Sequence, residues 1–168
     1  MLRFLLWGGM KMIGSVEEGQ QLLLRNILSF RKNLDQQSLV EISREIDEML
    51  AKNEARKDGN VVTITHNVTV ENGQQFIDIE MMIPLDKEIV VPSGFVFLPE
   101  FLLNDAFKIR IIGSPQQMQD AVQILAEHIQ NKNLKPDTPL YVVTVKEAKT
   151  QMDIDDMITD LYTGVETC

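Results

Sequence analysis

Cysteine and histidine are almost absent from this sequence. The one cysteine, Cys168, is the last residue, and the only histidines are His66 and His128. One thiol cannot form an internal disulfide, and so few sulfur and imidazole ligands argue against a zinc site. The acidic cluster at residues 153–160 lacks the glycine and the terminal glutamate of a calcium loop. We therefore expect no metal ion and no cofactor.

Positive charge and long apolar runs are also scarce. The chain has 16 lysines and arginines against 25 aspartates and glutamates, which gives a net charge of −9 over 168 residues. This deficit argues against a nucleic-acid surface and against binding to anionic membranes. The apolar start at residues 1–7 is far shorter than the ~20 residues of a membrane-spanning helix, and no small-residue cleavage site follows it. We expect a cytoplasmic protein that binds neither nucleic acid nor a membrane.

Catalytic motifs are missing as well. Neither GxxxxGK[ST] nor GxGxxG occurs, so no loop is built to cradle a nucleotide. Cys168 lies at a terminus, where disorder is the rule. His128 falls on the apolar stripe of a predicted helix, as a structural histidine would, and His66 is predicted to face solvent from a strand. The sequence offers no catalytic residue, and we expect a protein that is not an enzyme.

An internal repeat of about 80 residues organises what is present. Matching pairs follow one another in the same order along the two halves of the chain. They are Leu22-Leu23 with Leu102-Leu103, Gln36-Gln37 with Gln116-Gln117, Val61–Ile64 with Val142–Val145, and Asp78-Ile79 with Asp160-Leu161. We predict one domain at 20–168, made of repeats at about 20–85 and 100–166 and preceded by a poorly ordered extension at 1–19.

Each repeat predicts a strand, a helix and two further strands. The helices are expected after capping boxes that begin at Ser38 and Ser114. Alternating residues on both sides of Asn72-Gly73 predict a β-hairpin. The predicted strands lie at 22–30, 61–70 and 75–83 in the first repeat and at 107–112, 141–146 and 156–165 in the second. The fold class is α+β: two pseudo-repeated βαββ units form a concave antiparallel sheet, with two helices packed on one side and a cleft between the repeats.

The predicted strand at 75–83 carries the clearest candidate site. One of its faces is wholly apolar and predicts core, with Ile77, Ile79, Met81 and Ile83. The other face has two acids between an aromatic residue and a methionine, an arrangement suited to an apolar cation. The repeat alignment adds Tyr162 to this candidate site, because it is the residue equivalent to Glu80 in the second repeat. The candidate ligand-binding residues are Glu80, Asp78, Phe76, Met82 and Tyr162. The alternative is an outer sheet face with ordinary exposed polar residues.

Loose motifs over residues 20–166 resemble the GyrI-like effector-binding domain, an SHS2-like duplication. That domain is the sensor half of some multidrug-responsive transcription regulators. Gly113 and Pro115 match the turn before the family's helix, and Asn133-Leu134 with Pro136 and Pro139 match its return to a strand. The resemblance implies that an acidic residue on a central strand faces the ligand. Glu80 is the nearest candidate for that residue here.

A second set of motifs resembles an uncharacterised Firmicute family of the same architecture. Members of that family are often associated with type VII secretion loci, which implies a cytosolic accessory or binding role. The matching segments are Leu22–Ile27, Asp78–Pro84, Phe97–Gly113 and Asp160–Gly164.

The sequence leaves three functions open. The first is a stand-alone, non-enzymatic, effector-binding-like domain with an inter-repeat cleft for a small apolar or cationic molecule. The second is a cytosolic protein-binding accessory factor or chaperone linked to a secretion system. The third is a small hydrolase, because some GyrI-like relatives are hydrolases that use pocket acids and aromatics. A homodimer is compatible with each of the three.

Overall fold

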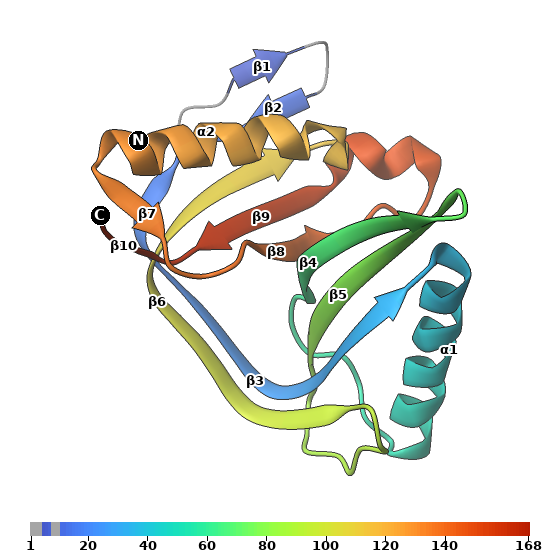
Figure 1. Cartoon of the computed structure of the whole chain (residues 1–168). Helices are drawn as coiled ribbons and strands as arrows, with labels where there is room; N and C mark the ends of the chain where they lie inside the picture. Colours follow the sequence, from blue (N-terminus) through green and yellow to red (C-terminus); the bar gives the residue numbers. More distant parts are fainter. Residues whose placement is uncertain (1–4, 8–10) are drawn as a thin grey trace. The chain divides into compact units, whose positions relative to one another are not determined.

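The computed structural model in Figure 1 describes residues 5–7 and 11–168. The chain divides into two compact units. The first unit combines the described part of 1–22 with 102–168, and the second unit is 23–101. Each unit contains one long helix, and the strand pairs within each unit are antiparallel. The predicted α+β class is therefore confirmed.

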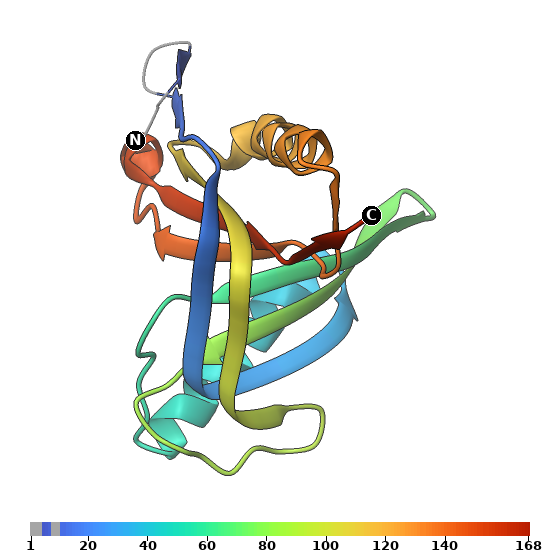
Figure 2. The ribbon, with the colours of Figure 1, turned by 90° about the vertical axis from the view of Figure 1, so that its left-hand side faces the viewer.

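Two long strands take part in both units. Strand β3 (Glu17–Leu34) passes from the first unit to the second after Leu22, and β6 (Val96–Ile112) passes back after Phe101. The two strands are neighbours in the sheet and run side by side in Figure 2.

The second unit is built around one central strand. Strand β5 (Gln74–Pro84) pairs with β3 on one side and with β4 (Val62–Glu71) on the other. The turn between β4 and β5 has positive φ at Asn72 (52°) and Gly73 (77°), as a type I′ hairpin turn requires. The hairpin predicted from Asn-Gly is confirmed.

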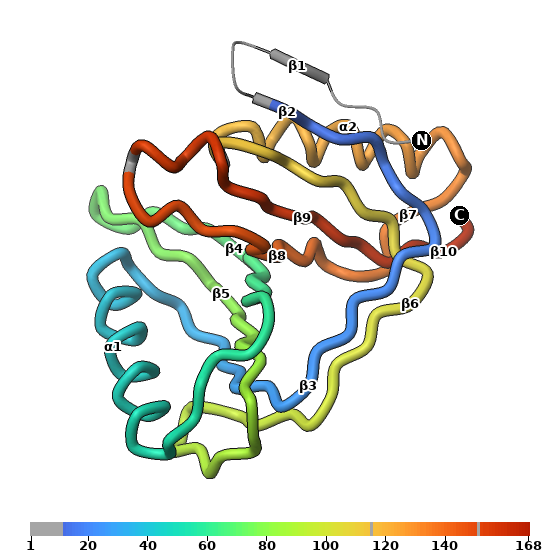
Figure 3. Tube along the Cα trace, turned by 180° about the vertical axis from the view of Figure 1, so that it is seen from behind, coloured from blue at the N-terminus to red at the C-terminus, as the bar shows by residue number. Residues whose placement is uncertain are grey.

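Helix α1 (Gln36–Lys52) covers one face of these strands, and the tube in Figure 3 shows it beside β5. Its N-cap is Asp35, which accepts the Ser38 backbone N–H over 2.7 Å. The capping box predicted at Ser38 is therefore wrong, because β3 continues to Leu34 and the helix begins directly after it. The core under α1 contains the predicted apolar face of β5. It consists of Leu28, Phe30, Ile42, Ile46, Met49, Leu50, Ala55, Ile79, Ile83, Leu85, Ile89 and Phe95.

The first unit is built around the pair of β6 with β9. Strand β6 pairs with β2 and β9, β8 pairs with β9, and β7 pairs with β10. Helix α2 packs on the core formed by Ile13, Phe107, Ile109, Ile111, Ala121, Leu125, Ile129 and Leu161. The elements are β1 (Leu5–Trp7), β2 (Lys11–Ile13), η1 (Pro115–Gln117), α2 (Met118–Asn131), β7 (Leu134–Pro136), β8 (Tyr141–Lys146), η2 (Gln151–Asp156), β9 (Ile158–Thr163) and β10 (Val165–Thr167).

The structure differs from the sequence-based expectation at three places in this unit. Within 11–19, assigned to a poorly ordered extension, residues 11–13 form β2 and residues 17–19 the start of β3, and Ile13 belongs to the core. Ser114 opens the 3-10 turn η1, so α2 begins only at Met118. The strand predicted from 156 begins at Ile158, because η2 occupies the preceding acidic residues. The rest of the predicted extension, 1–4 and 8–10, lies outside the described residues.

The element order in the second unit is strand, helix, strand, strand, and the first unit adds β7 after its helix. Three expectations stay predictions: the pseudo-repeat, the cleft between the repeats, and the packing of both helices on one side of the sheet.

Within 5–7 and 11–168, no helix has both the length and the apolarity needed to cross a membrane.

Candidate functional site

Four of the five predicted site residues lie on one face of β5, in the second unit. Phe76, Asp78, Glu80 and Met82 alternate with the core residues of the same strand, and we call them the acidic face. Met82 is only 2% exposed, whereas the other three are half-buried. Met82 therefore forms the closed end of this face and Phe76 the open end. The face is neither core nor a fully solvated outer surface.

Asp78 is held by an arginine from the neighbouring strand. Arg31 Nε and Nη2 donate to the two carboxylate oxygens of Asp78 over 3.1 and 3.0 Å. These hydrogen bonds lower the pKa of the Asp78 carboxyl and raise the pKa of the Arg31 guanidinium. Asp78 is thus ionised at neutral pH, and its charge is largely matched by its partner.

Glu80 has a different partner, on the other side of β5. His66 Nε2 lies 2.8 Å from Glu80 Oε1, and the side chains are 22% and 30% exposed. His66 falls at an irregularity in β4, between the residues that pair with Ile79 and Asp78. This bulge turns the imidazole toward Glu80. The prediction that His66 simply faces solvent does not include this contact. The apolar residues of β4 keep an even spacing on both sides of the bulge, so the sequence gives no sign that a bulge is there.

The charge of the acidic face depends on whether His66 carries a proton. Two carboxylates, Asp78 and Glu80, stand against one guanidinium, so the cluster carries one net negative charge when His66 is neutral. A cation near Glu80 would meet this charge together with the ring of Phe76.

The fifth predicted residue, Tyr162, belongs to β9 in the first unit. Burial raises the pKa of its phenol, and Lys108 opposes that rise. Lys108 Nζ lies 5.7 Å from the centre of the Tyr162 ring. The same lysine lies 3.6 Å from Asp160 Oδ2 and 3.6 Å from Glu17 Oε2. Tyr162 thus already faces a cation of its own unit.

Asp160, two residues before Tyr162, forms a largely buried ion pair with an arginine of the neighbouring strand. Arg110 Nε and Nη2 donate to its two oxygens over 2.8 and 2.9 Å. The Asp160 side chain is 4% exposed. These hydrogen bonds raise the pKa of the Arg110 guanidinium.

His128 has the structural role that its place on the helix stripe predicted. Its ring packs edge-on against Phe107, with 5.6 Å between the ring centres. Its Nε2 lies 3.5 Å from Glu18 Oε2, and Lys132 holds that same carboxylate at 2.9 Å.

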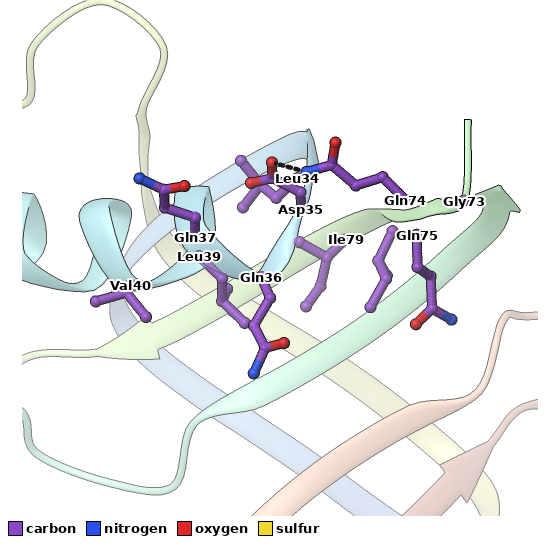
Figure 4. A pocket seen from close by; sticks show the side chains of 11 residues that line it. Leu34, Asp35, Gln36, Gln37, Leu39, Val40, Gly73, Gln74, Gln75 and Ile79 are labelled. Carbon is purple, nitrogen blue, oxygen red and sulfur yellow. Dashed lines mark hydrogen bonds between the residues drawn. The ribbon is translucent and has the colours of Figure 1, made fainter. Parts of the chain in front are cut away.

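Sequence reasoning missed a pocket at the start of α1, on the face of β5 opposite the acidic face. Its volume is about 650 Å³. Figure 4 shows side chains from the first turns of α1 and from β5 converging on it. We call it the glutamine pocket because its rim is formed by Gln36-Gln37 and Gln74-Gln75, two pairs that are visible in the sequence. The other lining residues are Leu34, Asp35, Leu39, Val40, Gly73, Ile77 and Ile79.

Comparison with known proteins identifies the fold. No family model and no curated protein matches the sequence. The crystal structure of the EcmrR C-terminal domain is similar, with a TM-score of 0.67 and 13% identity over 94% of this chain and 99% of that one. EcmrR in its DNA complex gives a TM-score of 0.65 and 11% identity over 95% of this chain. This chain spans only 59% of that longer EcmrR chain.

A structure described as a hydrolase from Listeria innocua is also similar. It has a TM-score of 0.55 and 14% identity, over 90% of this chain and 92% of that one. At these identities the likeness concerns the fold alone. The GyrI-like resemblance and the Firmicute and secretion-locus resemblance of the sequence stay predictions.

Proposed function

We propose that this chain is a small-molecule-binding domain whose acidic face takes an apolar cation. The observation that carries the proposal is the row of Phe76, Asp78 and Glu80, half-buried on one sheet face with an excess carboxylate. Aromatic rings and carboxylates attract organic cations most strongly where water is partly excluded. The resemblance to effector-binding domains and the fold shared with the EcmrR C-terminal domain support the same reading.

Glu80 is the residue on which the proposal rests most heavily. The charge of Asp78 is matched by two hydrogen bonds from Arg31, whereas Glu80 faces an imidazole through one oxygen. With a neutral imidazole, Asp78 and Glu80 share one guanidinium, because Arg31 lies opposite Glu80 in the β3–β5 register and hydrogen-bonds only to Asp78. A cationic ligand would supply a second positive charge.

Thermal unfolding with and without tetraphenylphosphonium tests this proposal. A ligand at 100 times its dissociation constant stabilises the folded state by about 2.7 kcal/mol. We expect the melting temperature of the wild type to rise and that of Glu80→Gln to stay almost unchanged. Glu88→Gln is the matched control, because Glu88 is an exposed glutamate in a loop of the same unit. An equal rise in wild type and Glu80→Gln would remove the acidic face from the site.

The proposed function is binding without turnover. Mass spectrometry of ligands recovered after long incubation checks this directly. We expect every compound that raises the melting temperature to be recovered unchanged, and a hydrolysed ester among them would favour the hydrolase alternative.

A protein partner is the second candidate, favoured by exposed apolar residues on β4. Val68 and Val70 are 47% and 68% exposed. Exposed apolar patches commonly mark interaction surfaces. A pull-down from the native host tests this candidate. The wild type should retain one partner, and the double variant Val68→Thr/Val70→Thr should not.

Sedimentation of the purified chain tests the homodimer.

A further inference from the structure

The core of the second unit is not closed at the start of α1. The buried residues of the helix begin at Ile42, six residues and nearly two turns after the helix itself begins at Gln36. Leu39 and Ile77 are half-buried there, and Val40 is 59% exposed. The glutamine pocket occupies this end, with an apolar floor made of Leu34, Leu39, Ile77 and Ile79.

Charge is nearly absent from the lining of the pocket. Among the described residues that line the pocket, Asp35 alone is charged, and each of its oxygens has a hydrogen-bond partner. Oδ1 accepts the Ser38 backbone N–H over 2.7 Å, and Oδ2 accepts Gln74 Nε2 over 2.6 Å, the contact dashed in Figure 4. The hydrogen bond from Ser38 lowers the pKa of Asp35, so the carboxylate is ionised. An anion would be repelled by this carboxylate, and its two hydrogen bonds already use part of its capacity to accept a ligand group.

Unused amides surround the apolar floor. Gln36, Gln37 and Gln75 make no side-chain hydrogen bond to any residue in the described part of the chain. Each amide offers both donors and an acceptor. The apolar surface also continues outward from the mouth, because Val68 lies opposite Ile77 and Val70 opposite Gln75 in the β4–β5 register.

We propose that the glutamine pocket is a second small-molecule site, for an uncharged and mainly apolar ligand that carries hydrogen-bonding groups. Its volume of about 650 Å³ is typical of ligand pockets, which are mostly apolar with a few polar groups that orient the ligand. The site lies on the opposite face of β5 from Asp78 and Glu80, so it takes a different class of ligand from the acidic face. It does not depend on the proposed function.

Two fluorescent probes that differ by one charge test the ligand class. N-phenyl-1-naphthylamine is neutral, and 1-anilinonaphthalene-8-sulfonate is the same ring system with a sulfonate. We expect the wild type to bind the neutral probe at least about tenfold more tightly, because desolvating a sulfonate beside Asp35 is unfavourable. Equal affinity for both probes would overturn the ligand class, and failure of the neutral probe to bind would overturn the site.

A matched pair of helix variants tests the location. Val40 is the fifth residue of α1 and Val122 the fifth residue of α2, and they are 59% and 36% exposed. Both Val40→Glu and Val122→Glu place a new charge on an exposed helix position, and circular dichroism checks that both fold. We expect Val40→Glu to weaken the neutral probe about tenfold and Val122→Glu to leave it unchanged.

Glu80→Gln separates this site from the acidic face. We expect it to leave binding of the neutral probe unchanged, whatever it does to a cation. If Glu80→Gln weakens the neutral probe and Val40→Glu does not, the probe occupies the acidic face and the pocket proposal is overturned. Equal weakening by Val40→Glu and Val122→Glu would overturn it as well.

Discussion

The two units each contain a bidentate arginine–aspartate pair between neighbouring strands, and the two pairs differ chiefly in burial. Arg31 binds Asp78 between β3 and β5, and Arg110 binds Asp160 between β6 and β9. The Asp78 side chain is 29% exposed and the Asp160 side chain 4%. Arg31 is 54% exposed and Arg110 35%.

This difference leaves the Asp78 carboxylate partly open to solvent and the Asp160 carboxylate almost fully enclosed. Asp160 is enclosed by Arg110 and Lys108, and a ligand could approach it only by displacing them. Asp78 shares a partly open face with Glu80, and the side chain of its partner Arg31 is more than half exposed. Under the proposed function, the same pair chemistry is structural in the first unit and takes part in binding in the second.

Removing each aspartate gives the largest expected difference between the units. Asp160→Asn should lower the free energy of unfolding by about 3 kcal/mol, because it leaves Arg110 and Lys108 without their buried partner. Asp78→Asn should cost far less, since Arg31 can rehydrate. Urea unfolding of both variants measures the contrast, and equal losses would contradict it.

Removing each arginine should separate affinity from stability. Arg31→Gln unmasks Asp78 and makes the acidic face more negative, so tetraphenylphosphonium should bind roughly threefold more tightly with little change in stability. Arg110→Gln should lower stability and leave that affinity unchanged. Parallel calorimetric titrations and melting curves measure both effects. A gain in affinity from both variants would show a general effect of net charge.

Acid unfolding gives the smallest expected difference. Because Arg31 lowers the folded-state pKa of Asp78, the pair stabilises the protein above the unfolded pKa of about 3.9. That contribution is lost as the pH falls through the lowered folded-state pKa. The urea midpoint of Arg31→Gln should therefore drop less between pH 6 and pH 3 than that of the wild type. Equal drops would mean that the pair contributes nothing in solution.

Features set by neighbours in the chain were predictable from the sequence. Asn72-Gly73 marks its turn locally, and the alternation from Gln75 to Ile83 separates the core face of β5 from the acidic face. The wrong cap at Ser38 shows the limit of this approach. Asp35 and Ser38 are both good N-caps, and the end of β3 decides between them.

Features set by neighbours in space were not predictable. The contact of His66 with Glu80 depends on a bulge against β5, which the even spacing of Val62, Ile64 and Val68 conceals. Asp78 and Asp160 stand at equivalent places in the predicted repeat, yet their burial depends on what packs over them. The glutamine pocket arises where the first turn of α1 leaves the core unfilled, a matter of packing that the two glutamine pairs alone do not indicate.

Calorimetric titration with two ions of the same shape and opposite charge tests the central claim most directly. Tetraphenylphosphonium and tetraphenylborate carry the same four phenyl groups around a positive and a negative centre. If the acidic face is a cation site, the wild type binds the phosphonium at least about tenfold more tightly than the borate, and Glu80→Gln loses this preference. Equal binding of both ions, or a preference that survives Glu80→Gln, would contradict the account.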